Sequence, residues 1–154
     1  FYEYIGGKCM TIMTETIMEL ISVEQWEEAY PIMKQLRTDL DKHQYFELMD
    51  EMRKDGYRLF AYFQGEEMAA IIGISVRVNF YNKRHVVVHD LVTTEKERSK
   101  GFGEKLLAFI HEWAKVNGAK YVALESALPR MDAHRFYEDK FQYDKWCYSF
   151  RKEL

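Results

Sequence analysis

A short basic stretch with two glycines, Arg98 to Gly103, carries the clearest chemical signal in the sequence. Gly101 and Gly103 stand one residue apart, so the backbone can approach a ligand closely and direct its N–H groups at it. Apolar residues then recur at helical spacing, which predicts a helix whose first N–H groups and positive dipole end lie beside the glycines. Arg98 and Lys100 add positive charge to the same loop. The combination predicts an anion site, most suitably for phosphate.

The segments on either side of this loop must position it. His85 to Thr93 is rich in β-branched residues and predicts a buried strand, and the polar turn from Thr94 to Arg98 joins that strand to the loop. The Lys-Ser/Thr pair that follows the second glycine in the phosphate loop of nucleotide hydrolases is absent here. We therefore expect the loop to hold phosphates and not to transfer them.

Strand, loop and helix together resemble the GCN5-related N-acetyltransferases, whose signature is Arg/Gln-x-x-Gly-x-Gly/Ala between a strand and a helix. Arg98, Gly101 and Gly103 match every position of that signature. Leu124 to Ser126 and Asp132 to Tyr137 are similar to the family's fifth strand and to its Ala-x-x-Phe-Tyr helix. The resemblance is more specific in this coenzyme-binding half than in the N-terminal half.

This resemblance implies an enzyme that transfers an acetyl group directly from acetyl-CoA, its co-substrate, to an amine acceptor of unknown identity, either a small molecule or a peptide. The residues implied to contact the coenzyme come from the strand end, the glycine loop and the start of the last helix: Leu91, Val92, Thr93, Arg98, Ser99, Lys100, Gly101, Phe102, Gly103, Glu104 and Arg130. Arg130 and Gln142 replace an asparagine and a glycine that are common in the family. These departures keep an alternative open, a non-catalytic acyl-CoA-binding or regulatory module with the same fold.

Two residues are candidates for the transfer chemistry. Attack of an amine on a thioester expels a thiolate that needs a proton, and the phenol of Tyr137 can supply one. Its usual pKa of about 10 lies above the roughly 8.5 of a simple thiol, so burial has to make the thiolate more basic. Glu125 stands where some relatives carry a general base, while a histidine or water remains an alternative base. A core tyrosine and a structural carboxylate are the ordinary interpretations of these two positions.

Composition and spacing exclude several other classes of protein. The chain has 154 residues and a net charge of −3, which predicts a single domain that binds no nucleic acid. No group of Cys, His and carboxylate residues has the spacing of a metal site, so we expect no metal. No apolar run is long enough to span a bilayer and the two cysteines form no close pair, so we expect a cytoplasmic protein without membrane contact. A homodimer is a further expectation, since members of the family often dimerise.

The predicted elements place these motifs in one fold. We expect residues 1–12 to be a leader and residues 13–154 to form the N-acetyltransferase domain. Ser22 and Gln25 predict a capping box that opens its first helix, which Pro31 should kink or divide. The turn at Gln64, Gly65 and Glu66 predicts a hairpin. Strands are predicted over Thr16–Ile21, Tyr57–Phe63, Met68–Val78, His85–Thr93, Tyr121–Glu125 and Tyr143–Arg151, and helices over Ser22–Leu40, Gln44–Lys54, Phe102–Val116 and Met131–Asp139. The order β-α-α-β-β-β-α-β-α-β predicts a mixed α/β (α+β) domain, with helices on both faces of a mostly antiparallel sheet.

Overall fold

The computed structural model describes residues 2–5, 8–11 and 14–154. The chain divides into two compact units, Phe1–Ala123 and Leu124–Leu154, which are described separately. In the first unit, strands β1 (Tyr2–Ile5) and β2 (Lys8–Thr11) form a two-stranded antiparallel sheet of their own. The boundary expected at residue 12 lies outside the described residues.

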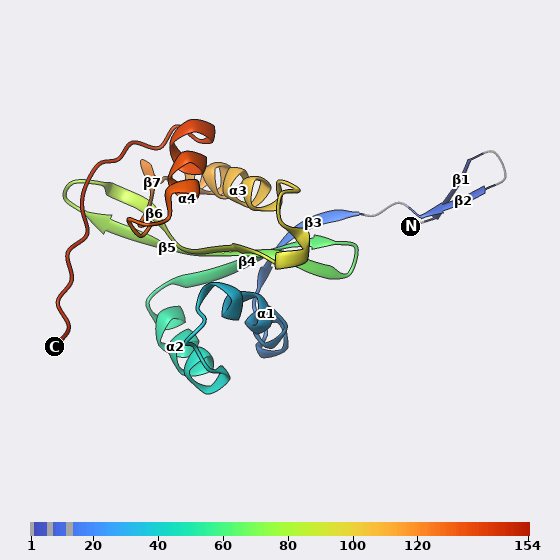
Figure 1. Ribbon diagram of the computed structural model, residues 1–154, viewed down its shortest axis with the longest axis horizontal. Coiled ribbons are helices and arrows are strands. Elements are labelled where there is room, and N and C mark those ends of the chain that lie inside the picture. Colours follow the sequence, from blue (N-terminus) through green and yellow to red (C-terminus); the bar gives the residue numbers. More distant parts are fainter. Residues whose placement is uncertain (1, 6–7, 12–13) are drawn as a thin grey trace. The chain divides into compact units, whose positions relative to one another are not determined.

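A five-stranded sheet forms the centre of the first unit (Figure 1). Its strands are β3 (Glu15–Leu20), β4 (Tyr57–Gln64), β5 (Glu67–Asn79), β6 (Lys83–Thr93) and β7 (Tyr121–Leu124), and they lie in this order across the sheet. The pairings β3–β4, β4–β5 and β5–β6 are antiparallel. The predicted mixed fold with a mostly antiparallel sheet is therefore confirmed.

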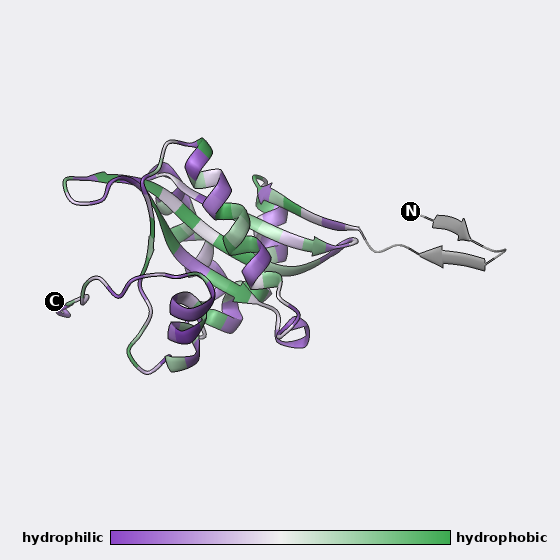
Figure 2. Ribbon diagram, turned by 90° about the horizontal axis from the view of Figure 1, so that it is seen from above, coloured by the Kyte–Doolittle hydropathy of each residue, from purple (hydrophilic) through white to green (hydrophobic). Residues whose placement is uncertain are grey.

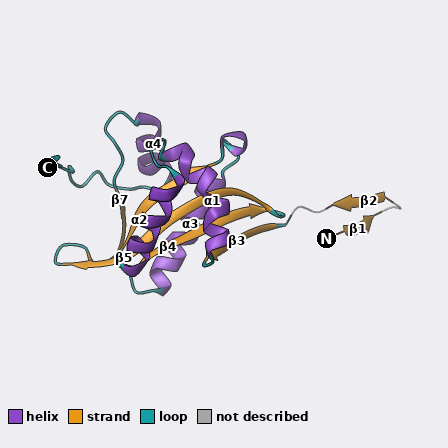
Figure 3. Cartoon of the chain, turned by 90° about the horizontal axis from the view of Figure 1, so that it is seen from below, coloured by secondary structure: helices purple, strands orange, loops and turns teal. Residues whose placement is uncertain are grey.

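Helices cover both faces of this sheet. Helices α1 (Val23–Leu36) and α2 (Lys42–Lys54) lie on one face and α3 (Phe102–Val116) lies on the other (Figures 1 and 3). Capping boxes begin α1 and α2, because the side chains of Ser22 and Asp41 accept the N–H groups of the glutamines three residues later. The capping box predicted at Ser22 is confirmed, whereas the one at Asp41 was not predicted.

Helix α1 runs through Pro31 without being divided. Of the two outcomes predicted at this proline, a kink or a division, the division is wrong. A proline inside a helix removes one backbone N–H and crowds the preceding turn. Here Ala29 and Ile32, on either side of the proline, are buried against the sheet at 0% and 4% exposure. Their packing holds the helix in place where the local sequence favours a break.

Two layers of apolar side chains bury the sheet. On the side of α1 and α2 the core includes Trp26, Met33, Tyr45, Met49, Tyr57, Leu59, Ile71 and Val92. On the side of α3, the side chains of Leu106, Leu107 and Ile110 are fully buried. Figure 2 shows hydrophobic residues along the central strands and helices of mixed colour, as expected for elements that bury one face.

The second unit contains a short helix, α4 (Met131–Arg135), followed by a π-helical turn, η2 (Phe136–Lys140). Residues 141–154 contain no strand, so the strand predicted over Tyr143–Arg151 is wrong. The alternation that predicted it is present, with Trp146, Tyr148 and Phe150 at every second position, but all three side chains are exposed. A strand exists only through hydrogen bonds to a neighbouring strand, and none is paired with this segment within residues 124–154.

Gly73 gives the first testable consequence of the fold. A Cβ at this position would stand 1.8 Å from Tyr57 Oη, which crosses over the glycine from the neighbouring strand. We expect Gly73→Ala to lower the free energy of unfolding by about 2–4 kcal/mol, because the ring must move and a buried hydrogen bond is lost. Urea denaturation measures this change. The cost should shrink in a Tyr57→Ala background, and an equal cost in both backgrounds would contradict the explanation.

Candidate active site

The basic glycine loop has the backbone geometry of an anion site. It follows a single 3₁₀ turn, η1 (Glu95–Glu97), and an extended Arg98. Ser99 and Gly101 both adopt left-handed backbone conformations, with φ of 67° and 81°. Left-handed residues placed between ordinary ones turn successive N–H groups toward a common side, which forms a concavity for an anion. Ser99 is not a glycine, so this conformation stores strain, as is common at functional sites.

Helix α3 begins directly at this loop. Gly101 is the residue that precedes its first turn, no side chain caps that turn, and the Lys105 N–H bonds to the Gly101 carbonyl at 3.0 Å. The earlier N–H groups of the helix, including those of Phe102 and Gly103, therefore have no acceptor within it. A Cβ on Gly103 would lie 3.4 Å from Thr93 Oγ1, so the glycine lets the helix start close to the end of β6.

The two basic side chains of the loop differ in their pairing. Lys100 Nζ lies 2.7 Å from a carboxylate oxygen of Glu97, whose side chain is only 12% exposed. Arg98 is exposed and forms no ion pair with any residue that the structure describes. The sequence suggested two equivalent cations, but in the structure Arg98 is the one whose charge is not already neutralised within the loop.

The strand that leads to the loop carries a β-bulge. Gly73 of β5 pairs with Asp90 and Ile74 pairs with Val88, so His89 is the extra residue of the bulge. Regular pairing resumes at Asp90, and the side chain of Val92 is part of the core on the side of α1 and α2. The three residues expected to offer backbone groups to the coenzyme, Leu91, Val92 and Thr93, thus lie between the bulge and the loop.

A buried polar network surrounds the bulge. Asp90 is 7% exposed and accepts hydrogen bonds from Tyr57 Oη at 2.7 Å and from Arg37 Nε and Nη2 at 3.0 and 2.9 Å. Arg37 Nη2 also donates to the His89 carbonyl at 2.8 Å. On the other side, His89 Nε2 and Ser75 Oγ are 2.6 Å apart. The guanidinium and the phenol satisfy a carboxylate that would otherwise be costly to bury.

Reasoning from the sequence missed Arg37, Tyr57 and Ser75. Two signals could have pointed to them. Asp90 interrupts an apolar strand, and a buried aspartate needs a cationic or hydrogen-bonding partner. Gly73 interrupts another strand, where an isolated glycine suggests a bulge or a close approach. Neither signal names the partner residue.

The remaining predicted residues belong to the second unit. Tyr137 lies in η2, half-buried, and burial raises the pKa of its phenol above the usual value, while the nearby charge of Arg130 partly offsets this shift. Its ring lies 5.8 Å from the ring of Tyr143. Glu125 and Arg130 are exposed. Gln142, where relatives carry a glycine, adopts a left-handed conformation with φ of 58°. The roles assigned to these side chains stay predictions.

Comparison with known proteins decides the family. A model of the "Acetyltransferase (GNAT) family" matches residues 20–143. A relative from Bacillus subtilis (strain 168), named as the uncharacterized N-acetyltransferase YhdJ, is 42% identical over 137 residues, which cover 88% of this chain and 96% of the relative. The chain belongs to the GNAT acetyltransferase family. The predicted family and the predicted class of enzyme, an acyltransferase, are confirmed.

Solved structures with low sequence identity share the fold of this GNAT protein. The aminoglycoside N-acetyltransferase AAC(6')-Iy in complex with CoA is 14% identical, with a TM-score of 0.81 over 93% of this chain and 97% of its own. A transcriptional regulator from Bacillus halodurans C-125 is 20% identical, with a TM-score of 0.77 over 92% of this chain and 100% of its own. At these identities the likeness establishes the fold alone.

Among the described residues, no group of three or more His, Cys, Asp or Glu side chains is arranged to hold a metal ion. Within the same part of the chain, no helix combines the length and the apolar character that crossing a membrane requires.

The polar network of this GNAT domain makes stability depend on pH in a defined direction. Burial, and then the charge of Asp90, raises the pKa of Tyr57 well above its usual value of 10. Tyr57 therefore keeps its proton in the folded protein above pH 10 and loses it in the unfolded chain, so stability falls as pH rises through this range.

We expect Tyr57→Phe to lower the free energy of unfolding at pH 8 by about 1–3 kcal/mol, through loss of the hydrogen bond to Asp90. Above pH 10 the variant should lose stability more slowly than the wild type, by up to about 1.4 kcal/mol per pH unit. Urea denaturation at pH 8 to 11 tests both effects. Tyr121→Phe, at an exposed position, should leave the slope unchanged, and parallel slopes for Tyr57→Phe and wild type would refute this account.

Proposed function

We propose that the protein is an acetyl-CoA-dependent N-acetyltransferase that transfers the acetyl group directly to an amine acceptor. The observation that carries this proposal is the loop from Arg98 to Gly103, where two left-handed residues precede an uncapped helix start. Such a site suits the pyrophosphate of coenzyme A. The family membership supports the proposal, and so does the CoA that the aminoglycoside N-acetyltransferase of similar fold binds.

The expected contacts of the coenzyme follow the chain. The pyrophosphate accepts N–H groups of the loop and the charge of Arg98, with Ser99, Lys100, Phe102 and Glu104 around it. The pantetheine arm pairs with the backbone of Leu91, Val92 and Thr93 like an added strand. Arg130 offers a further charged contact. The β-bulge at His89 lies just before this segment of β6, and backbone N–H groups of the strand polarise the thioester carbonyl.

The chemistry needs two proton transfers. The neutral amine attacks the thioester carbonyl, a C–N bond forms, and the C–S bond then breaks to expel the thiolate of coenzyme A. Tyr137 donates its proton to that thiolate. Burial raises the pKa of this phenol, so the same burial must also make the thiolate more basic for the transfer to proceed. Glu125, a histidine or water takes the proton that the amine must lose. No metal takes part in this scheme.

The acceptor and the cellular context belong to the same proposal. The acceptor is an amine on a small molecule or a peptide, and the enzyme works in the cytoplasm, where its exposed thiol at Cys147 stays reduced. We also propose a homodimer, because members of the family often dimerise. A second function, a non-catalytic acyl-CoA-binding regulator, is favoured by the name of the Bacillus halodurans protein of similar fold. Steady-state turnover with a panel of amines separates the two, because only the enzyme releases free coenzyme A thiol.

The loop can be tested with two matched glycines. Gly101 and Gly118 both have left-handed backbones, with φ of 81° and 76°, but Gly118 follows the other end of α3. Either change to Ala strains the backbone by about 1–2 kcal/mol. We expect Gly101→Ala to weaken coenzyme A binding about 10-fold, since the strained loop must be restored to bind phosphate. Gly118→Ala should leave the affinity unchanged. Equal affinities for coenzyme A in a calorimetric titration of both variants would show that the coenzyme does not bind at this loop.

Tyr137 can be tested by removing one oxygen. Tyr137→Phe should lower kcat by roughly 10²- to 10⁴-fold and leave the affinity for acetyl-CoA nearly unchanged, because the phenol acts only once the thioester breaks. The ring remains, so the melting temperature should barely change. Tyr143→Phe is a matched control, since burial raises the pKa of that phenol too. A Tyr137→Phe enzyme with wild-type kcat, when chemistry limits the rate, would reduce Tyr137 to a packing residue.

A further inference from the structure

The central sheet ends at a short apolar strand. β7 (Tyr121–Leu124) is the last of the five strands across the sheet, and in the described part of the chain no further strand lies beyond it. None of its four residues is charged, and each is at least partly exposed. The N–H and C=O groups along the outer side of an edge strand are open to pairing with another chain. β7 therefore offers an edge that no charged side chain of its own protects.

The opposite edge of the sheet, β3, is protected by charge. Its Glu15 forms an ion pair with Lys105 of α3 at 2.7 Å. Its Glu19 forms another with Arg58 of β4, also at 2.7 Å. Charged side chains on an edge strand oppose the addition of a further strand. Of the two edges of this sheet, β7 is therefore the one suited to strand addition.

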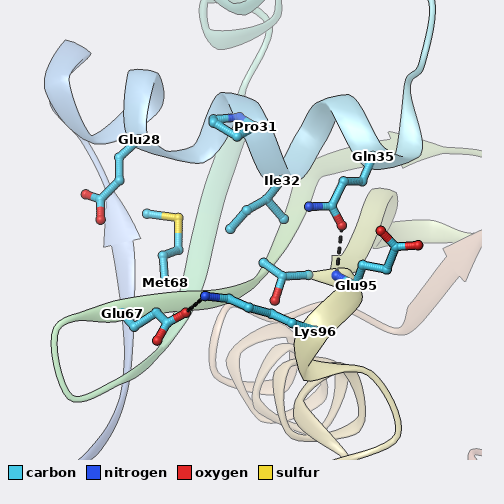
Figure 4. Close-up of a pocket in the computed structure, with 9 residues that line it drawn as sticks. Glu28, Pro31, Ile32, Gln35, Glu67, Met68, Glu95 and Lys96 are labelled. Carbon is cyan, nitrogen blue, oxygen red and sulfur yellow. Dashed lines mark hydrogen bonds and ion pairs between the residues drawn. The ribbon is translucent and has the colours of Figure 1, made fainter.

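The polar groups at another open part of the first unit are engaged with one another. Figure 4 shows the hollow lined by α1, the start of β5 and the turn after β6. There Gln35 Oε1 accepts the backbone N–H of Glu95 at 2.9 Å. Lys96 forms an ion pair with Glu67 across the same hollow. These contacts join the walls within the chain, whereas the outer edge of β7 has no strand to pair with.

The second unit contains a segment that has the pattern of a strand. In Tyr143–Arg151, which we call the aromatic segment, the aromatic residues Trp146, Tyr148 and Phe150 occupy every second position and are 65%, 78% and 92% exposed. Small side chains stand between them. In an extended strand alternate side chains point to the same face, so the three rings would form one aromatic face. Residues 142–154 belong to no helix or strand, and the rings stay largely in water.

We propose that the aromatic segment of one copy adds as a strand to β7 of a second copy, and that the second copy does the same in return. A single chain contains both features, yet its sheet ends at β7 and its aromatic segment forms no strand. Strand addition between two copies gives the edge its backbone hydrogen bonds and covers the aromatic face. Because the exchange is mutual, it closes on itself with two-fold symmetry and stops at a dimer.

The area of such an interface suits a specific dimer. The three aromatic side chains of one segment can bury roughly 500 Å², and the two segments together about 1,000 Å², which is where specific interfaces begin. The inference rests on the homodimer proposed above and gives it an interface. It does not depend on the transfer of an acetyl group, so the interface and the enzyme activity can fail separately.

Sedimentation of the whole chain tests the exchange, with a reductant present so that the exposed Cys147 cannot cross-link two copies. We expect a dimer with a dissociation constant below about 100 μM. Amide hydrogen exchange of residues 121–124 and 143–151 should slow as the protein concentration rises and the dimer forms. A weaker dissociation constant overturns the proposal. Protection of the aromatic segment that is independent of concentration also overturns it, because the segment then pairs within its own chain.

A pair of adjacent prolines isolates the backbone pairing. Successive residues of a strand direct their N–H groups to opposite sides, so Cys147→Pro/Tyr148→Pro removes one that faces β7 in either register. We expect the dissociation constant of the dimer to rise about 10-fold or more. Lys152→Pro/Glu153→Pro, just beyond the aromatic segment, is the matched control and should leave it unchanged.

Both pairs of substitutions fall outside helices and strands. The melting temperature, measured at a concentration where the chain is monomeric, should therefore equal that of the wild type and shows that each variant is folded. Equal dissociation constants for the two double variants would overturn this interface and leave the homodimer in place. Release of free coenzyme A thiol, measured separately, tests the proposed enzyme activity whatever the outcome at β7.

Discussion

The buried carboxylate of Asp90 is the constraint on which the arrangement around the candidate site depends. A charge in the middle of a sheet is tolerated only when cations and hydrogen-bond donors reach it. Arg37 comes to it from the end of α1 and Tyr57 from the start of β4. One side chain of β6 therefore ties a helix and a second strand to the strand that leads to the glycine loop.

The same network accounts for two features of the backbone. Tyr57 can reach Asp90 only because Gly73 has no side chain in its path. The bulge inserts His89 beside Asp90, and Arg37 bonds to the carbonyl of this extra residue. That donor gives the carbonyl of the bulged residue a defined hydrogen-bond partner. The bulge of β6 is thus stabilised by side-chain hydrogen bonds.

Local patterns in the sequence predicted the parts of this fold that depend on neighbouring residues. The glycine loop, the cap at Ser22, the hairpin of β4 and β5, and the alternation of strands and helices all follow from short-range chemistry. Partners far apart in the chain could not be predicted, since nothing in residues near Asp90 points to Arg37, which lies 53 positions away. Tertiary contacts also outweighed local preferences. Helix α1 continues through Pro31 because the residues on either side of the proline are packed in the core. The sequence showed the alternation of Tyr143–Arg151 but not whether a strand lies beside it.

The anion site proposed at the glycine loop depends little on charged side chains. Glu97 is nearly buried and holds Lys100, so it cancels most of the field that this lysine would contribute. Arg98 alone then supplies net positive charge, and a single exposed cation gives only modest affinity in water. The N–H groups at the start of α3 and the dipole of that helix must supply the rest. Because those groups are fixed by the left-handed conformations of Ser99 and Gly101, the proposed function requires the loop to select phosphate by geometry more than by charge.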